Sequence, residues 1–201
     1  MPSRRMLLIA ALCGSLSVPS FAQDAPPVRV RGTIDSVGGG SMVVTTRDGT
    51  KETLAIAPTV GVVAIIAVKI TDIAPNSYIG TAAIAQADGT LLAREIQVFP
   101  ESMRGVGEGH HPWDLEPHST MTNGTVGTVT GTSGRTLTVT YKGGEQKVVV
   151  PAHAPIITYA PAGKDMLVAG AHVIITAVKR PDGSLMATRV GVGKDGLVPP
   201  M

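Results

Sequence analysis

Alternating apolar and polar positions in short segments predict that this chain is built from β-strands. Val28 to Val37 alternates over most of its length, and the Gly38-Gly39-Gly40 turn leads into a second segment at Ser41 to Arg47. Asp48-Gly49 then separates this segment from Thr50 to Ile56. An Asp-Gly pair between two alternating segments is a strong signal for a tight hairpin. The beginning of the pattern therefore predicts three consecutive antiparallel strands.

A second hairpin is predicted further along the chain. Tyr78 to Gln86 and Leu91 to Phe99 flank Asp88-Gly89, which again reads as a tight turn. The apolar segment Val60 to Val68 lies between the two hairpin groups and predicts a buried strand, and the short turn at 70–73 is too short for a full helix. Five main strands with a small crossover between the third and the fourth follow the order of an OB-like barrel.

The second half of the chain repeats the first. Gly32-Thr33-Ile34 returns as Gly124-Thr125-Val126, and the segment Ala87 to Ala93 returns as Pro181 to Ala187. The corresponding strands are predicted at Thr125–Val129, Thr136–Tyr141, Gln146–Val150, Pro155–Tyr159, Ala171–Lys179 and Leu185–Val192. A repeat of this length indicates a duplicated small domain, because it is longer than the unit of a solenoid.

These patterns predict an all-β protein with two tandem five-stranded OB-like barrel modules. The modules are expected at 28–99 and 123–193, with an irregular linker at 100–122 and a tail at 194–201. Each module is small for an independent core, so we expect the two to pack against each other. A single larger sandwich is the alternative.

The order of motifs in the first module resembles a known family. Gly-Thr-Ile, Met-Val-Val-Thr, Leu-Ala-Ile, Asp-Ile, Gly and Asp-Gly-Thr-Leu resemble the DUF5666 domain, a family of exported OB-like modules of unknown function. The stretches 72–82 and 99–105 are similar to a subgroup that often carries the label "metal ABC transporter permease". The resemblance implies an OB-like fold and export, and it supplies no catalytic residues. A permease needs several membrane helices, and none is expected here, because the longest later apolar segment is Val60 to Val68.

The first 22 residues predict an export signal. Arg4-Arg5 precedes the apolar segment Met6 to Leu12, and Ser20-Phe21-Ala22 places small residues where a signal peptidase cleaves, before Gln23. Cys13 follows a leucine where a lipobox needs a small residue, so lipidation is not expected. The pattern predicts a bacterial periplasmic or secreted protein.

Removal of this signal changes the charge balance and narrows the function classes. The whole chain has 17 basic and 15 acidic residues, and the signal contains two of the basic ones and no acidic one. A nearly neutral mature chain argues against binding of nucleic acid, which needs a basic surface. The single cysteine also lies in the signal, so no thiolate site is expected. No Gly-x-Ser-x-Gly motif occurs, and an envelope hydrolase is the least favoured class.

The linker between the modules holds the candidate chemistry. It concentrates three of the five histidines around Trp113, and Pro112 and Pro117 exclude a regular helix there. Imidazole and carboxylate groups can bind zinc, copper or nickel. The candidate metal ligands are His110, His111 and His118, with Glu108, Asp114 and Glu116 as carboxylates. The other interpretation is a structured loop in which Trp113 packs against a barrel and the histidines are solvated.

The sequence therefore predicts an exported, non-enzymatic binding or structural protein of the bacterial envelope. The expected partner is a small ligand, a metal ion or an envelope protein, with no nucleic acid and no membrane span. The alternative is a periplasmic accessory protein that binds a divalent metal through the linker histidines. No resident cofactor is expected in the first case, and a zinc, copper or nickel ion is expected in the second.

Overall fold

The computed structural model of the protein describes residues 27–131 and 135–200. The predicted export signal at 1–22, with Cys13, lies outside the described residues. Twelve strands are present in the described part: β1 Val28–Gly38, β2 Ser41–Thr46, β3 Lys51–Ala67, β4 Tyr78–Ala85, β5 Leu91–Val98, β6 Gly109–Pro112, β7 Ser119–Thr130, β8 Thr136–Tyr141, β9 Gly144–Val149, β10 Ile156–Pro161, β11 His172–Lys179 and β12 Leu185–Gly193. Four 3₁₀ turns connect them: η1 Ile70–Asp72, η2 Glu101–Met103, η3 Lys164–Met166 and η4 Lys194–Gly196. The all-β prediction is confirmed.

Five strands close into a barrel, which we call the first barrel. Its cyclic order is β1-β2-β3-β12-β11, with antiparallel pairs throughout except for the parallel pair β12–β3. The interior is filled by buried aliphatic side chains, which include Val30, Ile34, Met42, Val44, Leu54, Val173, Ile175 and Val190. These residues occupy the apolar positions of the alternating pattern, so the alternation sets the inside and the outside of the barrel.

The second barrel has the equivalent cyclic order, β7-β8-β9-β5-β4. Its parallel closure, between β5 and β9, joins Leu91 to Val148 and Leu92 to Val149. The buried interior includes Ile79, Leu91, Ile96, Val126, Leu137, Val139 and Val148. The expected five-stranded, OB-like closed barrel is therefore present, with further strands outside it.

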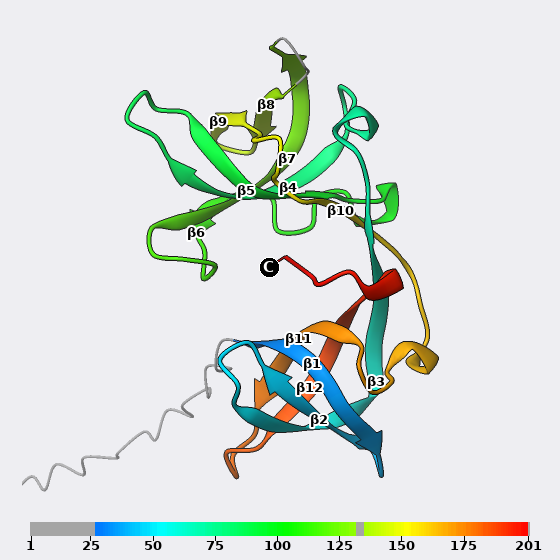
Figure 1. Ribbon diagram of the computed structural model, residues 1–201. Coiled ribbons are helices and arrows are strands. Elements are labelled where there is room, and N and C mark those ends of the chain that lie inside the picture. The colour runs from blue at the N-terminus through cyan, green and yellow to red at the C-terminus, as the bar shows by residue number, and fades with distance from the viewer. Residues whose placement is uncertain (1–26, 132–134, 201) are drawn as a thin grey trace, which may run out of the picture.

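The two barrels do not coincide with the modules predicted at 28–99 and 123–193. Each barrel takes three strands from one predicted module and two from the other, so β4–β5 and β11–β12 have exchanged places. The reason lies in β3, which continues for 17 residues and spans roughly 55 Å at the usual rise per residue. Figure 1 shows β3 leaving the first barrel and carrying the chain to the second barrel before β4 begins.

The repeated glycine at the start of each module has a steric role. A Cβ atom on Gly32 would lie 2.1 Å from the backbone oxygen of Thr45, and one on Gly124 would lie 2.4 Å from that of Thr140. Adjacent strands approach closely at both positions, and only glycine permits it. Equivalent residues also pair in equivalent register, since Thr33 faces His172 in the first barrel and Thr125 faces Tyr78 in the second.

A pair of strands connects the barrels. The segment Val60 to Val68, predicted as a buried strand, forms the second part of β3 and pairs with β10 from Val63 to Ala67. β10 pairs on its other side with β5 of the second barrel, from Ile156 to Thr158. The barrels are therefore joined through continuous hydrogen-bonded sheet. Among the described residues, no helical turn has the length and apolar character needed to cross a membrane.

The segment predicted as an irregular linker contains regular structure. β6 pairs with β7 in an antiparallel hairpin, and the residues between them form a tight loop. Ser119 Oγ donates hydrogen bonds to the backbone oxygens of Trp113 and Glu116, which fixes this loop. We call residues 105–118 the arm. Pro112 and Pro117 do interrupt helix, and the conformation that they allow here is a short strand and a turn.

Candidate functional site

A cavity of about 320 Å³ lies between the two barrels. Both barrels and the arm line it, so it exists only because the barrels are held face to face. Its volume is at the small end of the usual range for ligand pockets, which is about 300–1,000 Å³.

The first barrel supplies the floor of the cavity from two rows of cross-strand neighbours. One row contains Arg29, Thr176 and Arg189, and the next contains Ile174, Gly191 and Val63. Positions two apart on a strand face the same side of a sheet, so both rows point toward the second barrel. The side chains of Ile65 and Ile174 cover the backbone of Gly191, since a Cβ atom there would lie 2.8 Å from Ile65 Cδ1 and 3.1 Å from Ile174 Cγ2.

Residues next to β5 of the second barrel and in β10 form an aromatic side of the cavity, which we call the roof. The rings of Phe99 and Tyr159 are stacked with their centroids 5.8 Å apart, and the Tyr78 ring is tilted against Phe99 with the centroids 5.6 Å apart. The hydroxyl of Tyr159 donates a hydrogen bond of 2.5 Å to Oε1 of Gln97. Burial, with the nearby Glu95, raises the pKa of Tyr159, so this hydroxyl keeps its proton. The rings of Phe99 and Tyr159 therefore line this side of the cavity.

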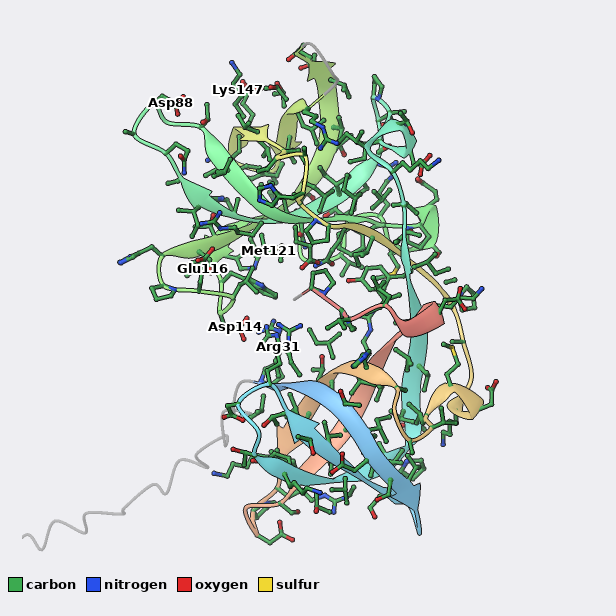
Figure 2. All side chains as sticks on the ribbon, in the orientation of Figure 1. Arg31, Asp88, Asp114, Glu116, Met121 and Lys147 are labelled. Carbon is green, nitrogen blue, oxygen red and sulfur yellow. The ribbon has the colours of Figure 1, made fainter. Side chains whose placement is uncertain are left out.

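The arm supplies the side wall and links the second barrel to the first. The guanidinium of Arg29 lies 4.0 Å from the centroid of the Trp113 ring, a cation–π contact. Asp114 accepts hydrogen bonds from Arg31 at 3.0 Å and from Arg29 at 3.4 Å. Figure 2 shows Arg31 and Asp114 close together in the space between the barrels. Partial burial opposes ionisation of Asp114, but the Arg31 hydrogen bond and the two positive charges hold the pKa of Asp114 below its usual range.

The three histidines predicted as metal ligands have separate surroundings. His110 Nδ1 lies 2.8 Å from the Thr122 hydroxyl, and its ring stacks on Tyr141. His111 follows it in β6 and therefore points to the opposite face, where it lines the cavity beside Trp113. His118 is exposed in the loop of the arm, with a φ of 63°. The strand geometry separates the imidazoles that are adjacent in sequence.

The three predicted carboxylate ligands are also engaged elsewhere. Glu108 accepts a hydrogen bond from the backbone N–H of Lys142 at 2.9 Å. Glu116 accepts one from Arg94 at 2.5 Å, and Asp114 holds Arg29 and Arg31 as described. Within residues 27–131 and 135–200, no three histidine, cysteine or acidic side chains are grouped to hold an ion. Binding of zinc, copper or nickel by the arm stays a prediction.

Titration with Cu(II) tests this metal prediction. If the arm binds the ion, the fluorescence of Trp113, the only tryptophan, is quenched, and the quenching weakens as pH falls and the imidazoles protonate. The triple variant His110/His111/His118→Ala should lose the response and keep the circular dichroism spectrum of the native protein. Equal quenching in the triple variant would contradict metal binding at these histidines.

A buried carboxylate that sequence reasoning missed lies beside the cavity. Glu95 in β5 is 1% exposed, and its oxygens make no hydrogen bond of ordinary geometry with the described residues. Burial raises the pKa of Glu95 to about 8, and the nearby Gln97 amide and the Arg31 and Arg47 guanidiniums offset only part of that effect. At neutral pH this group is therefore mainly a neutral carboxylic acid.

One sequence feature could have pointed to the surfaces around the cavity, namely a charged residue at the same position of two corresponding strands. Glu95 faces Ala82 in the second barrel as Arg189 faces Thr176 in the first, so these two charged residues hold equivalent positions in equivalent strands. Glu95 is buried, where a charge is costly unless it has a function or a partner, whereas Arg189 is exposed. Comparison of the charged positions between the two repeats would have identified this face.

The fold and the cavity together define an all-β protein of OB-like barrels with a candidate binding site between them. Comparison of the chain with models of known protein families, with curated proteins and with solved structures finds no match. The resemblance to the DUF5666 domain stays a prediction.

Proposed function

We propose that this is an exported, non-enzymatic binding protein whose ligand site is the cavity between the barrels. The observation that carries the proposal is the cavity itself, which is lined by the stacked rings of Phe99 and Tyr159 and by residues of both barrels. Concave sites with aromatic and apolar walls and a few polar groups are typical of small-molecule binding. The export signal predicted at 1–22 supports a place in the periplasm or outside the cell.

The position of the cavity supports a ligand that both barrels grip. Phe99 and Tyr159 come from the second barrel and from β10, Val63 and Ile174 come from the first barrel, and Trp113 comes from the arm. A ligand placed here would bury most of its surface against groups that the folded chain already holds in position. Preformed walls favour binding, because the protein loses little conformational entropy when the ligand enters.

Binding of naphthalenemethanol, a neutral planar probe, tests this proposal. Val63 lines the floor, and Val63→Phe should fill the cavity and weaken binding by about tenfold or more, since each kilocalorie of lost contact lowers affinity several-fold. Isothermal titration calorimetry and ligand-observed NMR measure the effect. Val37→Phe is the matched control, because Val37 is 40% exposed and does not line the cavity. It lies near the end of β1, whereas the cavity residue Arg29 lies near the start.

Two results decide this test. Binding to the native protein and to Val37→Phe, with weak binding to Val63→Phe, supports the cavity as the site. Equal affinity in all three proteins would place the probe elsewhere and contradict the proposal. Circular dichroism of the variants confirms that each retains the native fold.

A further inference from the structure

We infer that the ligand of this cavity is a small planar carboxylate, with an aromatic body under the roof and its carboxylate group on Arg189. This inference rests on the proposed function and names the class of ligand. Three observations support it: the positive charge of the cavity lining, the Arg189 guanidinium that has no ion-pair partner among the described residues, and the contrast between a cationic floor and an aromatic roof.

The lining of the cavity is cationic. Arg29 and Arg189 line it, and none of its described lining residues is an aspartate or a glutamate. A concave, partly apolar site with positive groups favours an anion, because the charges are less screened there than on an open surface.

Arg189 is the cation that remains available. Arg29 already contacts the Trp113 ring and Asp114, so its charge is partly compensated. Arg189 is exposed, and no carboxylate of the described residues lies within ion-pair distance of it. Arginine binds a carboxylate through two parallel hydrogen bonds, which fixes both its position and its orientation.

The row of residues on the floor provides a place for the head group. Thr176 lies between Arg29 and Arg189 on the neighbouring strand, so the two arginine backbones are about 10 Å apart, twice the spacing between strands. A carboxylate above Thr176 is within reach of the long Arg189 side chain, and the threonine hydroxyl is a second donor.

The opposite face provides a place for the body of the ligand. Phe99 and Tyr159 present stacked rings, and the Tyr159 hydroxyl is already bonded to Gln97. Glu95, which occupies the position equivalent to Arg189, is buried and does not line the cavity. One side of the cavity is therefore cationic and the other is aromatic, and an amphipathic anion matches both.

Three probes with the same ring test the inference on the full chain: naphthoate, naphthalenemethanol and naphthylmethylamine. Calorimetry should show naphthoate binding about tenfold or more tightly than the neutral alcohol, as expected for one hydrogen-bonded charge pair, with the amine weakest. Added salt should weaken the binding of naphthoate and leave the affinity for the alcohol unchanged. Arg189→Gln should lower the affinity for naphthoate to that for the alcohol, without affecting the alcohol.

Arg180→Gln is the matched control, because Arg180 lies at the turn end of the same β11–β12 hairpin, where it contacts Met186. It should leave all three affinities unchanged. If the alcohol binds as tightly as naphthoate, or if Arg189→Gln and Arg180→Gln behave alike, the inference is overturned and the binding site stands. If no probe binds the native protein, the proposed function itself is overturned.

Discussion

Replacement of Glu95 by glutamine is expected to make the protein more stable above about pH 8 and to remove most of a pH dependence that the native protein shows between about pH 5 and pH 8. The native protein should lose stability as pH rises through this window. The variant keeps the size and shape of the side chain but has no group that titrates in this range, so its stability should change much less with pH.

The sign follows from the pKa of Glu95 in the two states. Burial raises it from the usual 4.5 to about 8 in the folded protein. Between these values the unfolded chain has lost the proton and the folded protein still holds it, so rising pH favours unfolding. Above about pH 8 both states are ionised and the loss is complete. Its full size is on the order of 5 kcal/mol as an upper bound, since each unit of pKa shift corresponds to about 1.4 kcal/mol.

Chemical denaturation at a series of pH values measures this effect. Glu145→Gln is the matched control, because Glu145 is exposed in β9 and should give a curve parallel to that of the native protein. The groups that interact with Glu95 are Gln97 of β5 and Tyr159 of β10, together with Arg31 and Arg47 from the first barrel. Curves of the native protein and Glu95→Gln that remain parallel from pH 5 to pH 8 would show that Glu95 is ionised in the folded state.

The exchange of β4–β5 and β11–β12 between the barrels leads to a second prediction, which concerns the folding of the two halves of the chain. Residues 27–104 contain β1 to β5, and residues 105–200 contain β6 to β12, so neither half holds the five strands of one barrel as the structure pairs them. Each half alone should fail to unfold cooperatively as a monomer, because it would expose the apolar faces that normally close the barrel. Mixing the two halves should restore the cooperative transition and the native circular dichroism spectrum.

A protease site inserted at Gly105 to Gly107 provides the matching experiment on the whole chain. These residues form a turn with positive φ at both glycines, at the start of the arm. After cleavage, the fragments should stay together in gel filtration and separate only in denaturant. A stable monomeric barrel formed by residues 27–104 alone would show that β4–β5 can pair with β1–β3 within one half, and the exchange would not be required for folding.

The local parts of the fold could be predicted from the sequence. Alternation located β1, β2 and the hairpins, and the Asp-Gly turns form as expected, with Asp88 Oδ1 accepting the backbone N–H of Thr90 at 2.9 Å and Asp182 doing the same for Ser184. Periodicity reports which face of a strand is buried, and it does not report which strand lies beside it. The partner of β4–β5 depends on the length of β3, so the exchange could not be found this way.

The candidate site was predicted less well, for a physical reason. The metal hypothesis grouped residues that are close in sequence, but His110 and His111 point to opposite faces because they are adjacent in β6. The cavity instead joins Arg29, Arg189 and Phe99, which are far apart in the chain and meet only after the barrels have packed. Of the predicted metal ligands, His111 lines the cavity and Asp114 pairs with the lining residue Arg29.

The pairing of β3 with β10 also has a mechanical consequence. A single flexible connection would let one barrel swivel about the other, whereas two hydrogen-bonded strands resist torsion and act as a stiff strut. The ion pairs of Asp114 tie the barrels together again through the arm. Two connections at separate places fix the distance between the barrels, so a ligand of the proposed site would have to match a width that the fold sets in advance.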